Sequence, residues 1–186
     1  MMNPIPLTAA FPSALRDSAA EVVRRLQIEP SGAPCRTVCL HGETLQLPYR
    51  LYHPAPQPHA TQADHTAQLI ADCLHSRHHN GFVRQAAFRR LVRAGQADFV
   101  LPFALTLLGE YILPIQEDAV RLFRLNPAAF ARLCAANPRY WQTQQRRIIS
   151  YWNAYHRPDF PNLARYPIYQ AAQEINAAVR QLGSSV

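Results

Sequence analysis

Apolar residues recur every three or four positions over most of the chain, which is the spacing of amphipathic helices. The first such segment follows Ser13, which we expect as its N-cap, and ends before Pro30 and Gly32. A later apolar run starts at Asp98, expected as a cap, and should kink or break at Pro114. The other predicted helices cover Ala63–Arg77, Gly81–Ala94, Ile115–Leu125, Pro127–Ala136, Pro138–Tyr155 and Pro167–Leu182.

One region alternates with the period of a β-strand instead. Apolar and polar residues alternate on both sides of His41-Gly42-Glu43, which predicts a hairpin that pairs Arg36–His41 with Thr44–Tyr52. Pro48 has no N–H for a central ladder, so the pair should form a small ribbon at an edge. Two strands are marginal alone, and we expect the ribbon to lean on the helices.

Prolines mark several boundaries of the predicted elements. Residues 1–12 contain three prolines and should form an extended arm. His53–His59 carries proline at every second position and predicts a polyproline-like connector. Asn126-Pro127 and Asn137-Pro138 repeat one signal, an N-cap residue followed by proline at the first helical position.

The segment Asn80–Leu91 resembles the start of the second helix of a HEAT repeat. In that family an acidic or amide residue in the turn precedes a Val-Arg pair, a small-residue face and a leucine. The matching residues are Asn80, Val83, Arg84, Ala86, Ala87 and Leu91. The match covers one repeat, residues 66–94, and two later helix pairs fit by length without the Val-Arg signature. The resemblance implies antiparallel helix pairs stacked as a solenoid.

The whole chain also resembles a group of bacterial proteins that has no assigned activity. The shared stretches are Arg77–Arg84, Gly109-Glu110-Tyr111 and Arg146–Trp152. This resemblance implies an architecture and supplies no chemistry.

The chain length of 186 residues is enough for one domain with its own core. We therefore predict a single, mostly α-helical domain over residues 1–186, built as a HEAT-like solenoid or an irregular bundle with a small N-terminal β-hairpin. Residues 1–12 would be the arm, residues 13–60 the first helix, the hairpin and the connector, and residues 61–182 the repeat-like helical core.

The charge of the chain leaves two interpretations open. All 19 basic residues are arginine, and 12 acidic residues leave a net charge of +7. Guanidinium groups bind phosphate and carboxylate, so this excess would suit a nucleic-acid surface. Arginine codons of a GC-rich genome would give the same composition, with the charge scattered over helix surfaces. No run of basic residues exceeds two, which favours the scattered arrangement.

Neither a membrane segment nor an exported, disulfide-rich protein is indicated. A hydrophobic content of 48% with 17% charged residues is typical of a globular chain. No apolar run reaches the roughly 18 residues of a membrane span, and no signal peptide is apparent, so we expect a cytoplasmic protein without a membrane partner. The cysteines form no C-x-x-C pair and predict small buried thiols; they are Cys35, Cys39, Cys73 and Cys134.

Glu110 is the acidic residue of a long apolar run, so its carboxylate is expected to be shielded and paired. Arg84 is the expected partner, because the two helices are neighbours in the sequence. A buried ion pair that fixes how two helices dock is the favoured interpretation. The alternative is a general base or a ligand-binding carboxylate with a perturbed pKa.

His75 and His79 would lie one turn apart if their helix continued that far, and they would then be placed to share a metal ion. Asp72 or Glu110 would have to supply a third ligand. Gly81 indicates that the helix has already ended, so we predict no metal and no cofactor. A histidine near the helix end is instead expected to interact with the helix dipole.

Aromatic residues and arginines are interleaved through the C-terminal third of the chain. The predicted core stripe of this region consists of Trp141, Ile148, Trp152 and Tyr155. The predicted partner-binding surface lies on the outer face and consists of Tyr140, Arg146, Arg147, Tyr151 and Arg157.

Three classes of function remain open. The favoured one is a non-catalytic protein-interaction or adaptor module that uses this arginine- and aromatic-rich helical surface. The second is a nucleic-acid-binding protein that uses the same arginines on phosphate. The third is an enzyme or metal protein centred on Glu110 and the pair His75/His79. The chain contains no P-loop, G-x-S-x-G or G-x-G-x-x-G motif, which favours a non-catalytic protein.

Overall fold

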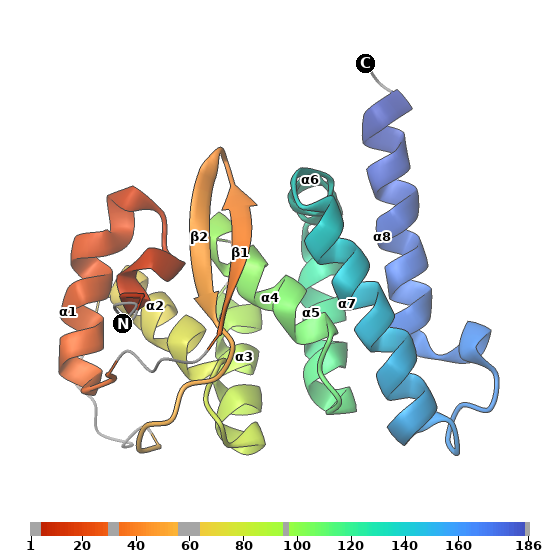
Figure 1. Cartoon of the computed structure of the whole chain (residues 1–186), viewed down its shortest axis with the longest axis horizontal. Helices are drawn as coiled ribbons and strands as arrows, with labels where there is room; N and C mark the ends of the chain where they lie inside the picture. The colour runs from red at the N-terminus through yellow and green to blue at the C-terminus, as the bar shows by residue number, and fades with distance from the viewer. Residues whose placement is uncertain (1–4, 30–33, 56–63, 95–96, 185–186) are drawn as a thin grey trace. The chain divides into compact units, whose positions relative to one another are not determined.

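The computed structural model describes residues 5–29, 34–55, 64–94 and 97–184 (Figure 1). The described chain is mostly α-helical, with one two-stranded antiparallel hairpin on the N-terminal side, which confirms the predicted fold class. It falls into two compact units, residues 1–95 and 96–186. Both the single domain and the HEAT-like arrangement stay predictions.

The elements follow one another in a simple order along the chain (Figure 1). The first unit contains the 3-10 turns η1 (Leu7–Ala10) and η2 (Ser13–Leu15), the helices α1 (Arg16–Leu26), α2 (His65–His75) and α3 (Gly81–Ala94), and the strands β1 (Cys35–Leu40) and β2 (Glu43–Pro48). The second unit contains the 3-10 turns η3 (Asp98–Val100) and η5 (Leu163–Arg165), the π-helical turn η4 (Trp152–His156), and the helices α4 (Leu101–Leu108), α5 (Leu113–Leu125), α6 (Pro127–Ala136), α7 (Pro138–Tyr151) and α8 (Pro167–Ser184).

The hairpin forms where the alternation predicted it. His41 and Gly42 make a two-residue turn with φ values of 49° and 83°, the left-handed conformation that such tight hairpins require. The ladder runs from the pair Leu40–Glu43 back to the pair Cys35–Pro48. The second strand ends at Pro48, earlier than predicted. The buried face of the ribbon consists of Val38, Leu40, Leu45 and Leu47.

The predicted extended arm over residues 1–12 is wrong in its described part. Leu7–Ala10 forms a 3-10 turn that contacts β2, and Phe11 is fully buried. Ser13 is not the N-cap of α1. It is the first residue of a second 3-10 turn, and α1 begins only at Arg16. The Ser13 N–H instead donates to Glu43 Oε2 at 2.7 Å. The described part of residues 1–12 therefore packs against the ribbon, although its prolines predicted a free arm.

The first helix ends earlier than the sequence suggested. α1 stops at Leu26, and Gln27 adopts a left-handed conformation with φ 51° while its N–H and that of Ile28 bond back to the last turn. Pro30 and Gly32, expected to end this helix, lie outside the described residues.

The helices α2 and α3 pack against each other, and their termini have clear local causes. Asp64 Oδ1 accepts the N–H groups of Thr66 and Ala67 at 2.6 and 3.1 Å, which caps α2. α2 ends at His75, two residues before the prediction, whereas α3 covers the predicted Gly81–Ala94.

In the second unit the helix break lies before the predicted position. Every residue of α4 is buried, and the helix ends at Leu108. Residues 109–112 form the connection, and Pro114 lies in the first turn of α5, where its missing N–H costs nothing. Asp98 begins a 3-10 turn, and α4 has no side-chain cap, so that predicted cap is wrong.

Each of the two Asn-Pro pairs lies at the start of a helix, but the two asparagine side chains make different contacts. Asn126 Oδ1 accepts the Ala129 N–H at 3.1 Å, as expected of an N-cap. Asn137 also precedes a helix that starts with proline, but its Nδ2 donates to Leu133 O at 2.8 Å, which satisfies a carbonyl in the last turn of α6.

Candidate binding surface

The end of α7 departs from the predicted core stripe. Trp141 and Ile148 are buried as expected, but Tyr155 is 57% exposed and His156 is buried in its place. The cause is the π-helical turn Trp152–His156, because a π turn takes in one more residue than an α turn and shifts the facing of the side chains. Tyr155 therefore belongs to the surface, and its assignment to the core is wrong.

Three tyrosine rings meet at this place, and we refer to Tyr111, Tyr151 and Tyr155 as the tyrosine cluster. The ring centroids are 5.7 Å apart for Tyr111–Tyr155, 5.9 Å for Tyr151–Tyr155 and 6.1 Å for Tyr111–Tyr151. The planes are inclined by 43–68°, the tilted and edge-to-face arrangement that aromatic pairs prefer. Tyr111 is 46% exposed, so two of the three rings are presented to solvent.

Arg147 ties the tyrosine cluster to the connection between α4 and α5. Its Nε donates to Gly109 O at 2.9 Å and its Nη2 to the Tyr151 hydroxyl at 3.2 Å. The guanidinium also lies 5.4 Å from the centroid of the Tyr151 ring. The sequence placed Arg147 and Tyr151 on one surface, and the structure brings them into contact.

Two further side chains hold the connection that carries Tyr111. His156 Nε2 lies 3.0 Å from Tyr111 O, and its ring is stacked on Tyr166 with centroids 5.5 Å apart. Gln116 Nε2 donates to Leu108 O at 2.9 Å, and its Oε1 accepts the Tyr166 hydroxyl at 2.7 Å. Burial raises the pKa of Tyr166, so this hydroxyl stays a donor at neutral pH. The tyrosine cluster thus rests on a fixed support.

Gly109 is required at this connection by space. A Cβ on Gly109 would overlap Oε1 of the buried Gln144 and would lie 3.3 Å from Arg147 Cδ. We expect Gly109→Ala to destabilise the protein by about 1 kcal/mol, because the end of the Gln144 side chain must move and Arg147 Cδ must shift slightly. Chemical denaturation measures this loss. Gly183→Ala is the matched control, since nothing lies within 4 Å of its Cβ, and an equal effect of both variants would contradict the steric explanation.

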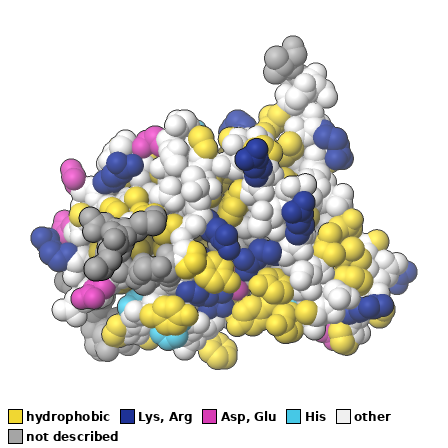
Figure 2. All heavy atoms as spheres, viewed as in Figure 1, with side chains coloured by type: hydrophobic (Ala, Val, Ile, Leu, Met, Phe, Trp, Pro, Cys, Tyr) yellow, Lys and Arg dark blue, Asp and Glu magenta, His cyan; other side chains and the backbone are white. Residues whose placement is uncertain are grey.

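The remaining residues of the predicted partner-binding surface differ in how exposed they are. Tyr140 is half-buried, and its hydroxyl lies 2.7 Å from Thr106 Oγ1, so it contributes to packing. Arg146 is exposed. Arg157 is exposed, lies 5.9 Å from the Trp152 ring centroid and donates to Asn153 Oδ1 at 3.3 Å. In Figure 2 the arginine side chains (dark blue) around α8 are separated by white and yellow side chains.

Arg84 and Glu110 are both buried, as the sequence predicted, but they belong to different units. Arg84 Nη1 donates to the carbonyl oxygens of His78 and His79, both at 2.9 Å, and so holds the turn between α2 and α3. Glu110 lies in the connection after α4, beside the residues that support the tyrosine cluster. The ion pair between Arg84 and Glu110 stays a prediction.

His75 and His79 are not one helical turn apart, as the position of Gly81 indicated. α2 ends at His75, and His79 is exposed and stacks on Tyr52 with centroids 5.2 Å apart. The neighbour of the His75 ring is His53 from the connector, at 5.1 Å. Within the described residues, no group of three or more His, Cys, Asp or Glu is arranged to hold a metal ion.

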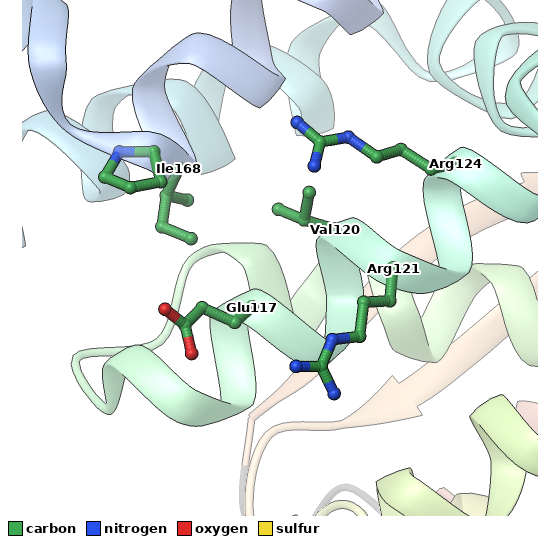
Figure 3. A pocket seen from close by; sticks show the side chains of 6 residues that line it. Glu117, Val120, Arg121, Arg124 and Ile168 are labelled. Carbon is green, nitrogen blue, oxygen red and sulfur yellow. The ribbon is translucent and has the colours of Figure 1, made fainter.

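An open pocket of about 220 Å³ lies between α5 and the start of α8 (Figure 3). Its lining residues are Glu117, Val120, Arg121, Arg124, Pro167 and Ile168. Arg124 extends across Val120 towards Ile168 in Figure 3. The guanidinium groups already pair with carboxylates, Arg124 with Glu174 at 3.0 Å and Arg121 with Asp118 at 3.2 Å. The two arginines of the pocket are therefore exposed and already paired, and none of its charged lining residues is buried.

The fold and the surface together define a mostly helical protein that presents an exposed, well-supported tyrosine cluster. A comparison with protein-family models, curated proteins and solved structures finds no match in any of the three. No described helix combines the length and the apolar character needed to cross a membrane.

Proposed function

We propose that the chain is a non-catalytic binding module and that its second unit docks a protein partner through the tyrosine cluster. The observation that carries this proposal is the pair of exposed rings, Tyr111 and Tyr155, on a support fixed by Arg147 and His156. Tyrosine supplies a large contact area at a small entropic cost, and tyrosine and arginine are enriched at interface hot spots.

The nucleic-acid alternative uses the same region of the second unit. Arg146 and Arg157 are exposed and would suit phosphate contacts, and tyrosine rings can stack on bases. The tyrosine planes are inclined by 43–68°, so no two of them form a parallel slot for a base. This inclination favours a protein partner, whose side chains pack against rings at any angle.

The test has two stages. The partner is first captured from a native cell lysate with the whole chain and is then purified for calorimetry. We expect Tyr111→Ala and Tyr155→Ala each to weaken binding by at least about 10-fold while changing stability by less than about 1 kcal/mol. Tyr52→Ala is the control, because Tyr52 is an exposed tyrosine of the first unit that lies outside the tyrosine cluster.

The result that would overturn the proposal is full binding by both cluster variants. A generic single-stranded oligonucleotide provides the competing outcome. Tight binding that collapses between 50 and 200 mM salt, by roughly 10³-fold or more, would replace the protein partner with nucleic acid.

Two further parts of the proposal concern architecture and location. The packed pair α2 and α3 supports a HEAT-like arrangement, since it spans the segment with the Val-Arg signature. A cytoplasmic location fits the buried thiols of Cys73 and Cys134, which belong to a reducing compartment.

A further inference from the structure

Two histidine rings of the first unit end in buried nitrogens that have no hydrogen-bond partner within the described residues. These atoms are His53 Nε2 and His75 Nδ1. The side chains are 8% and 4% exposed, and their ring centroids are 5.1 Å apart with the planes inclined by 42°. Two neighbouring buried ring nitrogens without a hydrogen-bond partner are unfavourable unless something else satisfies them.

The hydrogen bonds around His53 fix its tautomer. His53 Nδ1 lies 2.9 Å from Pro54 O, and a carbonyl oxygen only accepts, so Nδ1 carries the proton and Nε2 the lone pair. A metal-binding histidine typically donates its other ring N–H to a backbone carbonyl in this way, which fixes the ring. His53 therefore has the arrangement of a ligand.

His78 lies against His53 but cannot be a ligand. Its Nδ1 accepts the Asn80 N–H at 2.9 Å, and its Nε2 donates to His53 O at 2.8 Å. Both ring nitrogens are thus engaged, and the second contact holds the His53 backbone in place. The two carboxylate oxygens of Asp72 are also engaged, by Arg90 at 2.6 Å and by Gln68 at 3.2 Å.

The surroundings of the pair favour a cation of low charge. Asp72, one turn before His75 in α2, has both carboxylate oxygens engaged and so cannot balance a divalent ion, and the Arg90 guanidinium acts on His75 with positive charge. A univalent ion that needs only two ligands therefore suits this pair better than a divalent ion does.

We propose that His53 Nε2 and His75 Nδ1 form a two-nitrogen binding site for Cu(I). Imidazole is a good copper ligand, and the closed-shell Cu(I) ion is stable with only two donors. The ion would join the connector after β2 to the end of α2. This site lies in the first unit and is independent of the protein partner proposed for the second.

The test is a Cu(I) titration of the whole chain under anaerobic, reducing conditions against a chromogenic competitor, followed by X-ray absorption at the copper edge. We expect one equivalent of Cu(I), two nitrogen scatterers and no sulfur. His53→Gln and His75→Gln should each lose at least about 100-fold in affinity, because each removes one of only two ligands. His65→Gln, an exposed histidine of α2, should match the wild type.

Several results would overturn this site. They are the absence of Cu(I) binding, sulfur scatterers that assign the ion to a cysteine, or equal affinity of wild type and His53→Gln. Zn(II) alone should not bind, and Zn(II) affinity above that for Cu(I) would contradict the argument from charge. The absorption spectrum of the wild type keeps the test decisive even if a glutamine variant fails to fold.

Discussion

Arg77→Ala is expected to destabilise the protein by about 3–5 kcal/mol. Arg77 is 1% exposed and belongs to the turn after α2. Its Nε donates to Pro48 O at 3.0 Å and its Nη2 to Tyr49 O at 2.5 Å. The variant removes a donor from both carbonyls, at about 1–3 kcal/mol each when buried, and leaves the volume of a large side chain empty. Denaturation by urea at pH 7 measures the loss.

The comparison variants separate packing from hydrogen bonding. Arg77→Met keeps most of the volume and should lose about half as much, since only the donors are removed. Arg93→Ala is the control for loss of an arginine from an exposed position of α3 and should stay within about 0.5 kcal/mol. A loss below about 1 kcal/mol for Arg77→Ala would show that the hairpin does not depend on this residue.

The metal-free protein is expected to lose roughly 2–3 kcal/mol of stability through His75 as the pH falls from 7 to 4.5. Burial lowers the pKa of His75 from 6.5 to about 4, with the positive charges of His53, Arg90 and His78 acting in the same direction. Between these two pKa values the His75 side chain is protonated in the unfolded chain and neutral in the folded chain. The stabilisation is therefore complete above about pH 6.5 and is lost as the pH falls towards 4.

His75→Gln isolates this contribution from the titration of the carboxylates. The difference in stability between pH 7 and 4.5, measured by chemical denaturation with a chelator present, should be smaller in the variant by that same amount. Identical pH dependence of the two proteins would mean that His75 is accessible to protons in the folded state. The pKa of His53 is lowered too, so His53→Gln should reduce the slope in the same direction.

The local signals of the sequence were sufficient for most of the secondary structure. α3 and α6 have the predicted bounds, because glycine, proline and Asn126 act within a few residues of themselves. The hairpin turn also follows from local geometry, since few residues other than glycine accept the conformation that Gly42 adopts. Errors arose where a distant surface changed the local preference, as where β2 contacts the 3-10 turn Leu7–Ala10.

The sequence predicted only part of the tyrosine cluster and its support. Helical spacing placed Arg147 and Tyr151 on one face, and they touch. The same spacing placed Tyr155 in the core, and it could not show that one π-helical turn would bring Tyr155 to the surface beside Tyr111. The signal that was available is Gly109, which ends α4 and so directs Tyr111 away from the helix.

Periods and caps within a few residues define a mostly helical chain, its hairpin turn and which helical faces are apolar. Packing between separate elements brings Tyr111 against Tyr155 and His53 against His75, contacts across 44 and 22 positions. It also brings Arg77 against the hairpin. Such contacts depend on how separate elements pack, and the hydrophobic period within one element carries no information about them.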